Sequence, residues 1–232
     1  MKVPPFYFNY MIQLEDGRKT RFNIVLDPQT LVMIRPKIQS TPGWTALSNE
    51  KCTCCSLNEN SHPFCPVAVN ISGLVRRFKD ILSCNNCTVI CETADRTYLK
   101  KTSAMEGLTS VFGIIMATSN CPVMEFLKPM ARFHLPFSNI EETAVRSASL
   151  FLLGQYFDNK NGVGTPVFDF KELEKQYRKV RLVNEGLLAR IRYLGKKDAD
   201  KNAIITLHSL SQFLSMEIDF SIETIAYLFK KK

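Results

Sequence analysis

Cysteines crowd the segment between residues 52 and 65. Cys52 and Cys55 form a Cys-x-x-Cys pair, and Cys65 follows directly before Pro66. The pair lets two thiolates of one turn bind the same ion, with zinc–sulfur distances of about 2.3 Å. Pro66 suits the first turn of a helix, so Cys65 is expected at a helix N-terminus, where unpaired N–H groups favour a thiolate. The spacing therefore predicts a zinc site with Cys52, Cys55 and Cys65 as three ligands.

The residues alone leave the fourth ligand open. His62 is the nearest candidate in the chain, whereas Cys54 would be strained if both Cys52 and Cys55 bind. A second pair, Cys84-Asn-Asn-Cys87, would complete a site of four thiolates, although a whole helix would have to lie between the pairs. The third candidate is Cys121, because Cys121-Pro122 repeats the Cys-Pro dipeptide of residues 65–66 at the expected start of another helix.

Catalysis is the alternative for the same region. A cysteine at a helix N-terminus can act as a nucleophile, so Cys121 with His134 as its base would suit a hydrolase or transferase. An open zinc site with Glu125 or Glu141 nearby would suit one too. However, Ser138 and Glu141 match the capping box S-x-x-E, which accounts for Glu141 without a reaction. We therefore favour a role without catalysis.

A basic segment raises a second alternative, the binding of nucleic acid. The positive residues of the expected helix over 171–197 are Lys171, Lys175, Arg178, Lys179, Arg181, Arg190, Arg192, Lys196 and Lys197. Such a helix can contact phosphates. Glutamates interrupt the series and no stacking aromatic residues interleave with it, so a solvated helix face explains the pattern better.

Composition indicates a globular chain that is kept in the cytoplasm. The sequence has 232 residues, 45% hydrophobic and 22% charged, and a net charge of +8. Prolines and charges break the apolar N-terminus, which excludes a secretory signal, and no apolar run reaches the roughly 20 residues that span a bilayer. We expect no membrane association. Eight cysteines in such a chain should stay reduced, which favours metal ligands over disulfides.

Hydrophobic periodicity predicts an α+β fold. Apolar residues alternate over 6–12 and 22–26 around an Asp-Gly-Arg turn, and again over 89–101, which predicts antiparallel strands. A third short strand is expected at 31–34, and a helix from Pro66 to Ser83. From residue 103 onward the period is helical, with helices expected at about 103–118, 122–133, 139–158, 168–193, 198–214 and 217–230. The predicted organisation is a sheet with one helix over 1–102, followed by a helical bundle over 103–232 packed against it.

Several motifs together resemble a family of bacterial proteins known only as a domain of unknown function. These motifs are Cys52-x-x-Cys55 through Cys65-Pro-Val-Ala-Val-Asn70, Met116-Ala-Thr-Ser119 with Cys121-Pro122, and Pro129-Met-Ala-Arg-Phe-His-Leu-Pro136. The resemblance covers nearly the whole chain and implies no activity. It does imply that Cys52, Cys55, Cys65 and Cys121 belong to the pattern of the family, which favours Cys121 as the fourth ligand.

The expected function follows from a closed site. Four protein ligands leave zinc no position for water, which is typical of a structural rather than a catalytic metal. We expect a zinc-stabilised cytoplasmic protein without catalytic activity, with a regulatory or interaction role toward an unidentified protein or small ligand.

Overall fold

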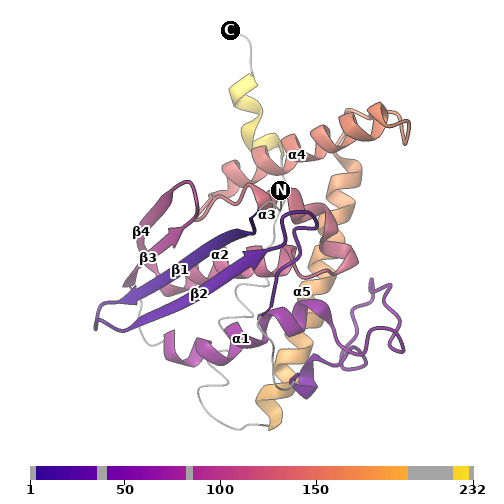
Figure 1. Cartoon of the computed structure of the whole chain (residues 1–232). Coiled ribbons are helices and arrows are strands. Elements are labelled where there is room, and N and C mark those ends of the chain that lie inside the picture. The colour runs from indigo at the N-terminus through magenta and orange to yellow at the C-terminus, as the bar shows by residue number, and fades with distance from the viewer. Residues whose placement is uncertain (1–3, 36–40, 82–85, 198–221, 230–232) are drawn as a thin grey trace.

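The structure is a computed structural model that describes residues 4–35, 41–81, 86–197 and 222–229. Its N-terminal part is a four-stranded antiparallel sheet in the order β2-β1-β3-β4 (Figure 1). The strands are β1 (Phe6–Leu14), β2 (Lys19–Leu26), β3 (Asn86–Glu92) and β4 (Thr97–Ser103). In the described ranges, one α-helix lies between β2 and β3 in the chain and the other α-helices follow β4, so the predicted α+β class is confirmed.

Alternation in β1 directs one row of side chains into the core. Phe8, Tyr10 and Ile12 are buried, whereas the residues between them are partly exposed. The turn to β2 closes at Gly17, whose φ of +86° suits a residue without a Cβ. The predicted hairpin is therefore present.

Two helices lie under the sheet. α1 (Pro66–Ile81) begins at Pro66 as predicted, and α2 (Ala104–Ala117) follows β4 directly. The hydroxyl of Ser103, the last residue of β4, accepts the Glu106 N–H at 3.2 Å and so caps α2. α2 contacts β1, β3, β4 and α1, which places it between the sheet and the rest of the helices.

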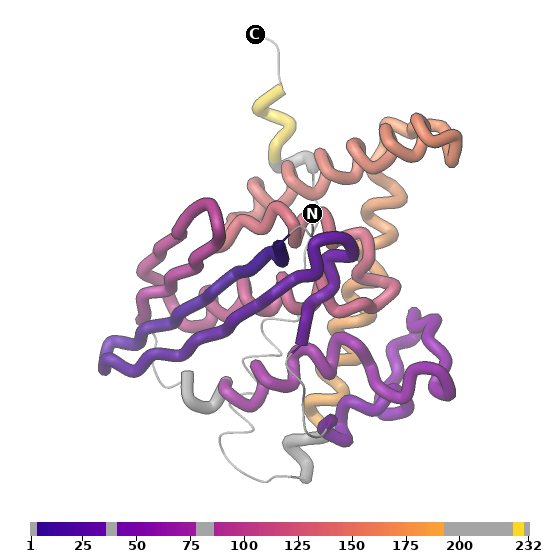
Figure 2. Tube along the Cα trace, in the orientation of Figure 1, coloured from indigo at the N-terminus to yellow at the C-terminus, as the bar shows by residue number. Residues whose placement is uncertain are grey.

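Further helical elements are the 3-10 segment η2 (Pro122–Leu127), the short α3 (Lys128–Arg132), α4 (Ile140–Lys160), the long α5 (Lys171–Lys197) and the 3-10 segment η3 (Ile222–Phe229). They lie beside and above the sheet in the view of Figure 2, with η3 at the top against α4. Within the described ranges no single helix is long and apolar enough to cross a membrane; α2 and the segment Pro122–Arg132 pass such a test only together, and they are bent by 116°.

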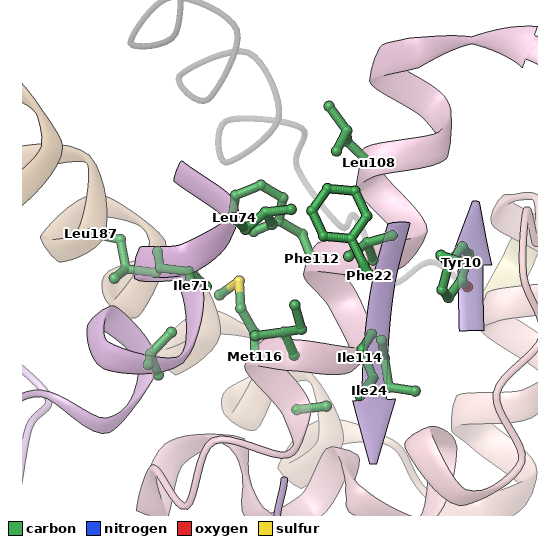
Figure 3. Packing of buried hydrophobic residues seen from close by; sticks show 14 of the residues in the cluster. Tyr10, Phe22, Ile24, Ile71, Leu74, Leu108, Phe112, Ile114, Met116 and Leu187 are labelled. Atoms are coloured by element: carbon green, nitrogen blue, oxygen red, sulfur yellow. The ribbon is translucent and has the colours of Figure 1, made fainter. Parts of the chain in front are cut away.

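One hydrophobic core joins the sheet to the helices. Tyr10 and Ile24 from the sheet, Ile71 from α1, Phe112 from α2 and Leu187 from α5 belong to the same buried cluster (Figure 3). The sheet, α1, α2 and α5 are thus held together through shared apolar contacts.

Two predicted elements differ in the structure. Residues 31–34 form no strand but a single bridge between Leu26 and Met33, since Leu31 has a φ of +56° and the Met33 N–H donates to the Thr118 carbonyl at 2.9 Å. The helix expected at 122–133 is split into η2 and α3, because Pro129 has no N–H for a continuous helical ladder.

The structure describes only part of the predicted C-terminal helices. The helix expected at 198–214 lies outside the described residues. The described part of the helix expected at 217–230 is the 3-10 segment η3, which contacts α4.

The capping box of α4 is shifted by one residue from the prediction. Asn139, not Ser138, is the N-cap: its side chain accepts the Glu142 N–H at 2.8 Å, and the Glu142 carboxylate accepts the Asn139 N–H at 2.8 Å. Glu142 rather than Glu141 thus has the structural role that the sequence assigned to its neighbour.

Candidate metal centre

The Cys-x-x-Cys pair lies on a tight turn. The Cys55 N–H donates to the Cys52 carbonyl at 3.0 Å, which brings both residues onto the same side of the loop. Cys54, between them, points elsewhere: its thiol contacts the Lys179 carbonyl on α5 at 3.6 Å. This arrangement agrees with the expectation that Cys54 does not share a site with both Cys52 and Cys55.

Cys65 stands at the start of α1. Its carbonyl accepts the Val69 N–H at 3.0 Å, which is the first hydrogen bond of the helix, and its own N–H donates to the Thr45 carbonyl at 2.8 Å. The side chain is buried, with 6% of its surface exposed. The loop that carries Thr45 therefore fixes the position of this thiol.

Cys121 occupies the same kind of position at the start of η2. It precedes Pro122 and is buried, with 7% of its surface exposed. The preceding Asn120 has a φ of +66°, a left-handed conformation that asparagine tolerates well, and it turns the chain between α2 and η2. This turn carries Cys121 toward the loop of residues 52–65.

All four predicted thiols line one small cavity. The lining includes Cys52, Cys55, Cys65 and Cys121, and its other walls come from Leu47, Ser56, Leu57, Pro66, Val67, Pro122, Val123, Val183 and Arg190. The cavity volume, measured for the centre of a water-sized sphere, is about 10 Å³. That is close to the space that a single water requires. A cavity of this size is too small for an organic substrate.

The thiols influence each other electrostatically. Burial, with smaller contributions from the neighbouring Cys65 and Cys54, raises the pKa of Cys52 to about 12, while Arg190 acts in the opposite direction. Burial also raises the pKa of Cys121 to about 11, against the effect of the Val123 and Met124 N–H groups. In the absence of a bound cation the thiols of Cys52 and Cys121 are therefore neutral near pH 7.

The sulfurs of the four cysteines do not converge on one point in this structure. Within the described part of the chain, no group of three or more His, Cys, Asp or Glu side chains is placed to hold an ion as it stands. The Cys52 sulfur leans against α5 at Gly186, so closely that a Cβ on Gly186 would lie 2.6 Å from it. A cysteine has a single χ1 angle with three staggered positions, so its sulfur can turn inward without a change of the backbone.

The structure places the other ligand candidates elsewhere. His62 is exposed in the loop, where its Nδ1 lies 3.0 Å from the Ser61 hydroxyl, and it does not line the cavity. Cys87 is buried in β3 and contacts the Thr102 carbonyl at 3.3 Å. Cys84 lies outside the described residues. Among the candidates for a fourth ligand that the structure describes, Cys121 is the one that lines the cavity with the other thiols.

The residues of the catalytic alternative have structural partners. His134 is hydrogen-bonded through Nε2 to the Tyr10 hydroxyl and packs edge-on against Phe8, with ring centroids 5.3 Å apart. Burial, together with the nearby Arg146, lowers the pKa of His134 to about 3. Its imidazole is thus neutral near pH 7, and it packs against β1 rather than lining the cavity.

The two glutamates of that alternative are also engaged. Glu125 forms an ion pair with Lys128 at 2.7 Å. Glu141 accepts a long hydrogen bond, 3.5 Å, from the Tyr227 hydroxyl of η3. Neither glutamate lines the cavity.

The basic residues of α5 divide into two groups. Lys175 and Arg178 are exposed and pair along the helix with Glu172 and Glu174, at 3.4 Å and 4.0 Å. Arg190, by contrast, is completely buried in the wall of the cysteine cavity. Sequence reasoning placed Arg190 on the solvated face, although its spacing of three residues from Leu187 indicated the apolar face.

The comparisons with known proteins give a family without an assigned activity. A family model described as Domain of unknown function (DUF6901) matches residues 8–230. No curated protein and no solved structure matches the chain.

Proposed function

The chain belongs to the family Domain of unknown function (DUF6901), and from the arrangement of its cysteines we propose that it is a zinc-stabilised protein without catalytic activity. Cys52, Cys55, Cys65 and Cys121 would be the ligands. The observation that carries the proposal is that these four side chains, from three separate segments, line a single cavity of about 10 Å³.

Size and chemistry favour a single zinc ion. Thiolates are ligands that zinc prefers, and four of them make a tetrahedral structural site. The cavity is too small for an iron–sulfur cluster, and the described cysteines are all free of disulfides. Coordination at about 2.3 Å requires the sulfurs to turn inward by changes in χ1.

The role of the ion would be cohesion. Cys52 and Cys55 lie in a loop, and Cys65 directly precedes α1. Cys121 directly precedes η2, which follows α2 in the chain. A zinc ion would therefore tie a loop with little regular structure to two helical elements of the core. Since four protein ligands leave no open position, the site would not activate water.

A regulatory or interaction role in the cytoplasm is the second part of the proposal. Large apolar side chains are exposed at the end of α4 and in the loop after it, namely Tyr156, Phe157, Val163 and Phe168. Exposed apolar side chains can serve as a surface for binding a partner. These side chains support binding of a protein or small ligand more than they support a reaction.

Metal analysis with thiol mapping tests the zinc site. Protein purified without chelator should contain one zinc per chain, and alkylation followed by mass spectrometry should show Cys52, Cys55, Cys65 and Cys121 protected until chelator is added. Cys54, which is half-buried outside the cavity, should react equally with and without chelator. A chain that takes up no zinc, and whose four thiols react at rates that chelator does not change, would refute the proposal.

A further inference from the structure

A buried arginine faces the cysteine cavity. Arg190 of α5 has none of its surface exposed, and it lines the cavity together with the four thiols. Its two terminal nitrogens donate to backbone carbonyls, one to Ala46 and the other to Leu47 at 3.1 Å. These contacts hold the guanidinium against the same loop whose Thr45 carbonyl accepts the Cys65 N–H.

The charge of Arg190 has no acidic partner within the described ranges. None of the ion pairs formed there includes Arg190. Its Nε is buried and has no hydrogen-bond partner. Burying a guanidinium without a negative charge nearby is costly, so the position requires an explanation.

A zinc ion bound by four thiolates has the opposite problem. Its two positive charges balance two of the four thiolate charges, so the complex carries two negative charges in a buried place. Buried net charge is stabilised by a paired charge with hydrogen-bonding capacity. Arg190 supplies one positive charge and one free N–H in the wall of this cavity.

We infer that Arg190 is the buried counter-charge of the metal centre. Its positive charge stabilises the zinc-bound protein and destabilises the metal-free protein. This inference rests on the proposed zinc site. Arg190 does not coordinate the ion; it acts through the thiolates, and it thereby couples metal binding to the position of α5 and of residues 46–47.

The test compares Arg190→Met with the wild type in the presence and absence of zinc. With zinc, the variant should bind the ion about 10- to 100-fold more weakly in competition with a chelator, as for other residues that support metal ligands. Without zinc and with the thiols reduced, the variant should unfold at the same or a higher urea concentration than the wild type, because the uncompensated charge is gone. Arg190→Lys, which keeps the charge, should retain most of the zinc affinity, and Arg192→Met on the exposed side of α5 is the matched control.

A purely structural role gives a different result. If Arg190 serves only to hold the Ala46 and Leu47 carbonyls, Arg190→Met will be destabilised equally with and without zinc, which would overturn the inference while leaving the zinc site intact. If the wild type binds no zinc, both proposals fail.

A second comparison applies should the metal-free chain not fold. In a Cys55→His background the complex has one negative charge fewer, so Arg190→Met should reduce zinc affinity by a clearly smaller factor than in the wild type. Equal factors in both backgrounds would overturn the inference.

Discussion

The Cys52 sulfur lies directly against Gly186 of α5, at a point where a side chain on residue 186 would collide with it. Gly186 and Arg190 are four residues apart and so lie on the same face of α5. On this face, Gly186 lets the backbone of α5 approach the Cys52 sulfur closely, and Arg190 places a positive charge beside the cavity that the four thiols line. The long helix and the cysteine loop are packed as parts of one site.

Gly186→Ala should destabilise the metal-free protein. The new Cβ would lie 2.6 Å from the Cys52 sulfur and 3.4 Å from the Cys52 Cα. Crowding of this kind costs about 1–3 kcal/mol, reduced here because the sulfur can yield by rotation about χ1 and because alanine is the better helix former. The loss should be smaller with zinc bound, because coordination turns the sulfur away from α5. Urea unfolding with and without zinc measures both values. Gly154→Ala in α4, where a Cβ meets nothing within 4 Å, is the control. If Gly186→Ala lowers the free energy of unfolding equally with and without zinc, the Cys52 sulfur keeps its position when zinc binds.

Cys65→Ser should remove the zinc and most of the stability that depends on it. The thiol is buried at the start of α1, so the variant also places a hydroxyl in the cavity wall, which costs about 1–3 kcal/mol by itself. Zinc content and the urea midpoint are measured together. Cys54→Ser, outside the cavity, should keep its zinc.

Chelator treatment separates the two effects of this substitution. Wild-type protein stripped of zinc should unfold at a lower urea concentration, much as Cys65→Ser does. A Cys65→Ser variant that is folded, stable and free of zinc would contradict a structural metal.

Most of the sheet, and three of the four cysteines that line the cavity, could be predicted from the sequence. Alternation over residues 6–12 sufficed for β1 because the side-chain period of a strand is a local property. Cys52, Cys55 and Cys65 could be recognised as candidate metal ligands because they lie in one short segment. Cys121 was one of three candidates by residue type, because its approach to the loop depends on how α2, η2 and α1 pack.

The role of Arg190 was hidden for a related reason. Arginine on a basic helix is usually exposed, and local spacing does not reveal that a loop more than a hundred residues earlier covers it. The split of the 122–133 helix was readable from Pro129, which lacks the N–H that a continuous helix needs. Residue type and short spacing thus predicted the elements, whereas the composition of the cavity came from tertiary packing.

His134 should make stability depend on pH in the acidic range. Its pKa is about 3 in the folded protein, because burial and Arg146 disfavour the imidazolium, and about 6.5 in an unfolded chain. Between these values the unfolded state binds a proton that the folded state does not, so the free energy of unfolding rises with pH, by up to about 1.4 kcal/mol per pH unit. This contribution is complete above about pH 6.5 and is lost as the pH falls toward 3.

Replacement by glutamine tests this assignment. His134→Gln cannot bind the proton, so the difference in unfolding free energy between the wild type and the variant should change with pH between about 3 and 6.5 and be constant above that range. Urea titrations at several pH values measure it. His62→Gln, on the exposed loop, is the matched control, and a difference that does not vary with pH would contradict the burial of a neutral His134.

Gly107→Ala should destabilise the joint between α2 and the sheet. A Cβ on Gly107 would lie 2.6 Å from Cγ2 of Val89, a completely buried residue of β3 with a stiff, branched side chain. Overpacking of this kind costs about 1–3 kcal/mol and exceeds the roughly 1 kcal/mol that alanine gains over glycine in a helix. Gly113→Ala, exposed in the same helix with nothing within 4 Å, should instead raise the unfolding free energy by about 0.5–1 kcal/mol. Because Val89→Ala opens space beside residue 107, Gly107→Ala should cost less free energy of unfolding in that background. Urea unfolding of the wild type, the two single variants and the double variant measures this difference. Strictly additive losses would mean that α2 does not approach β3 at Gly107.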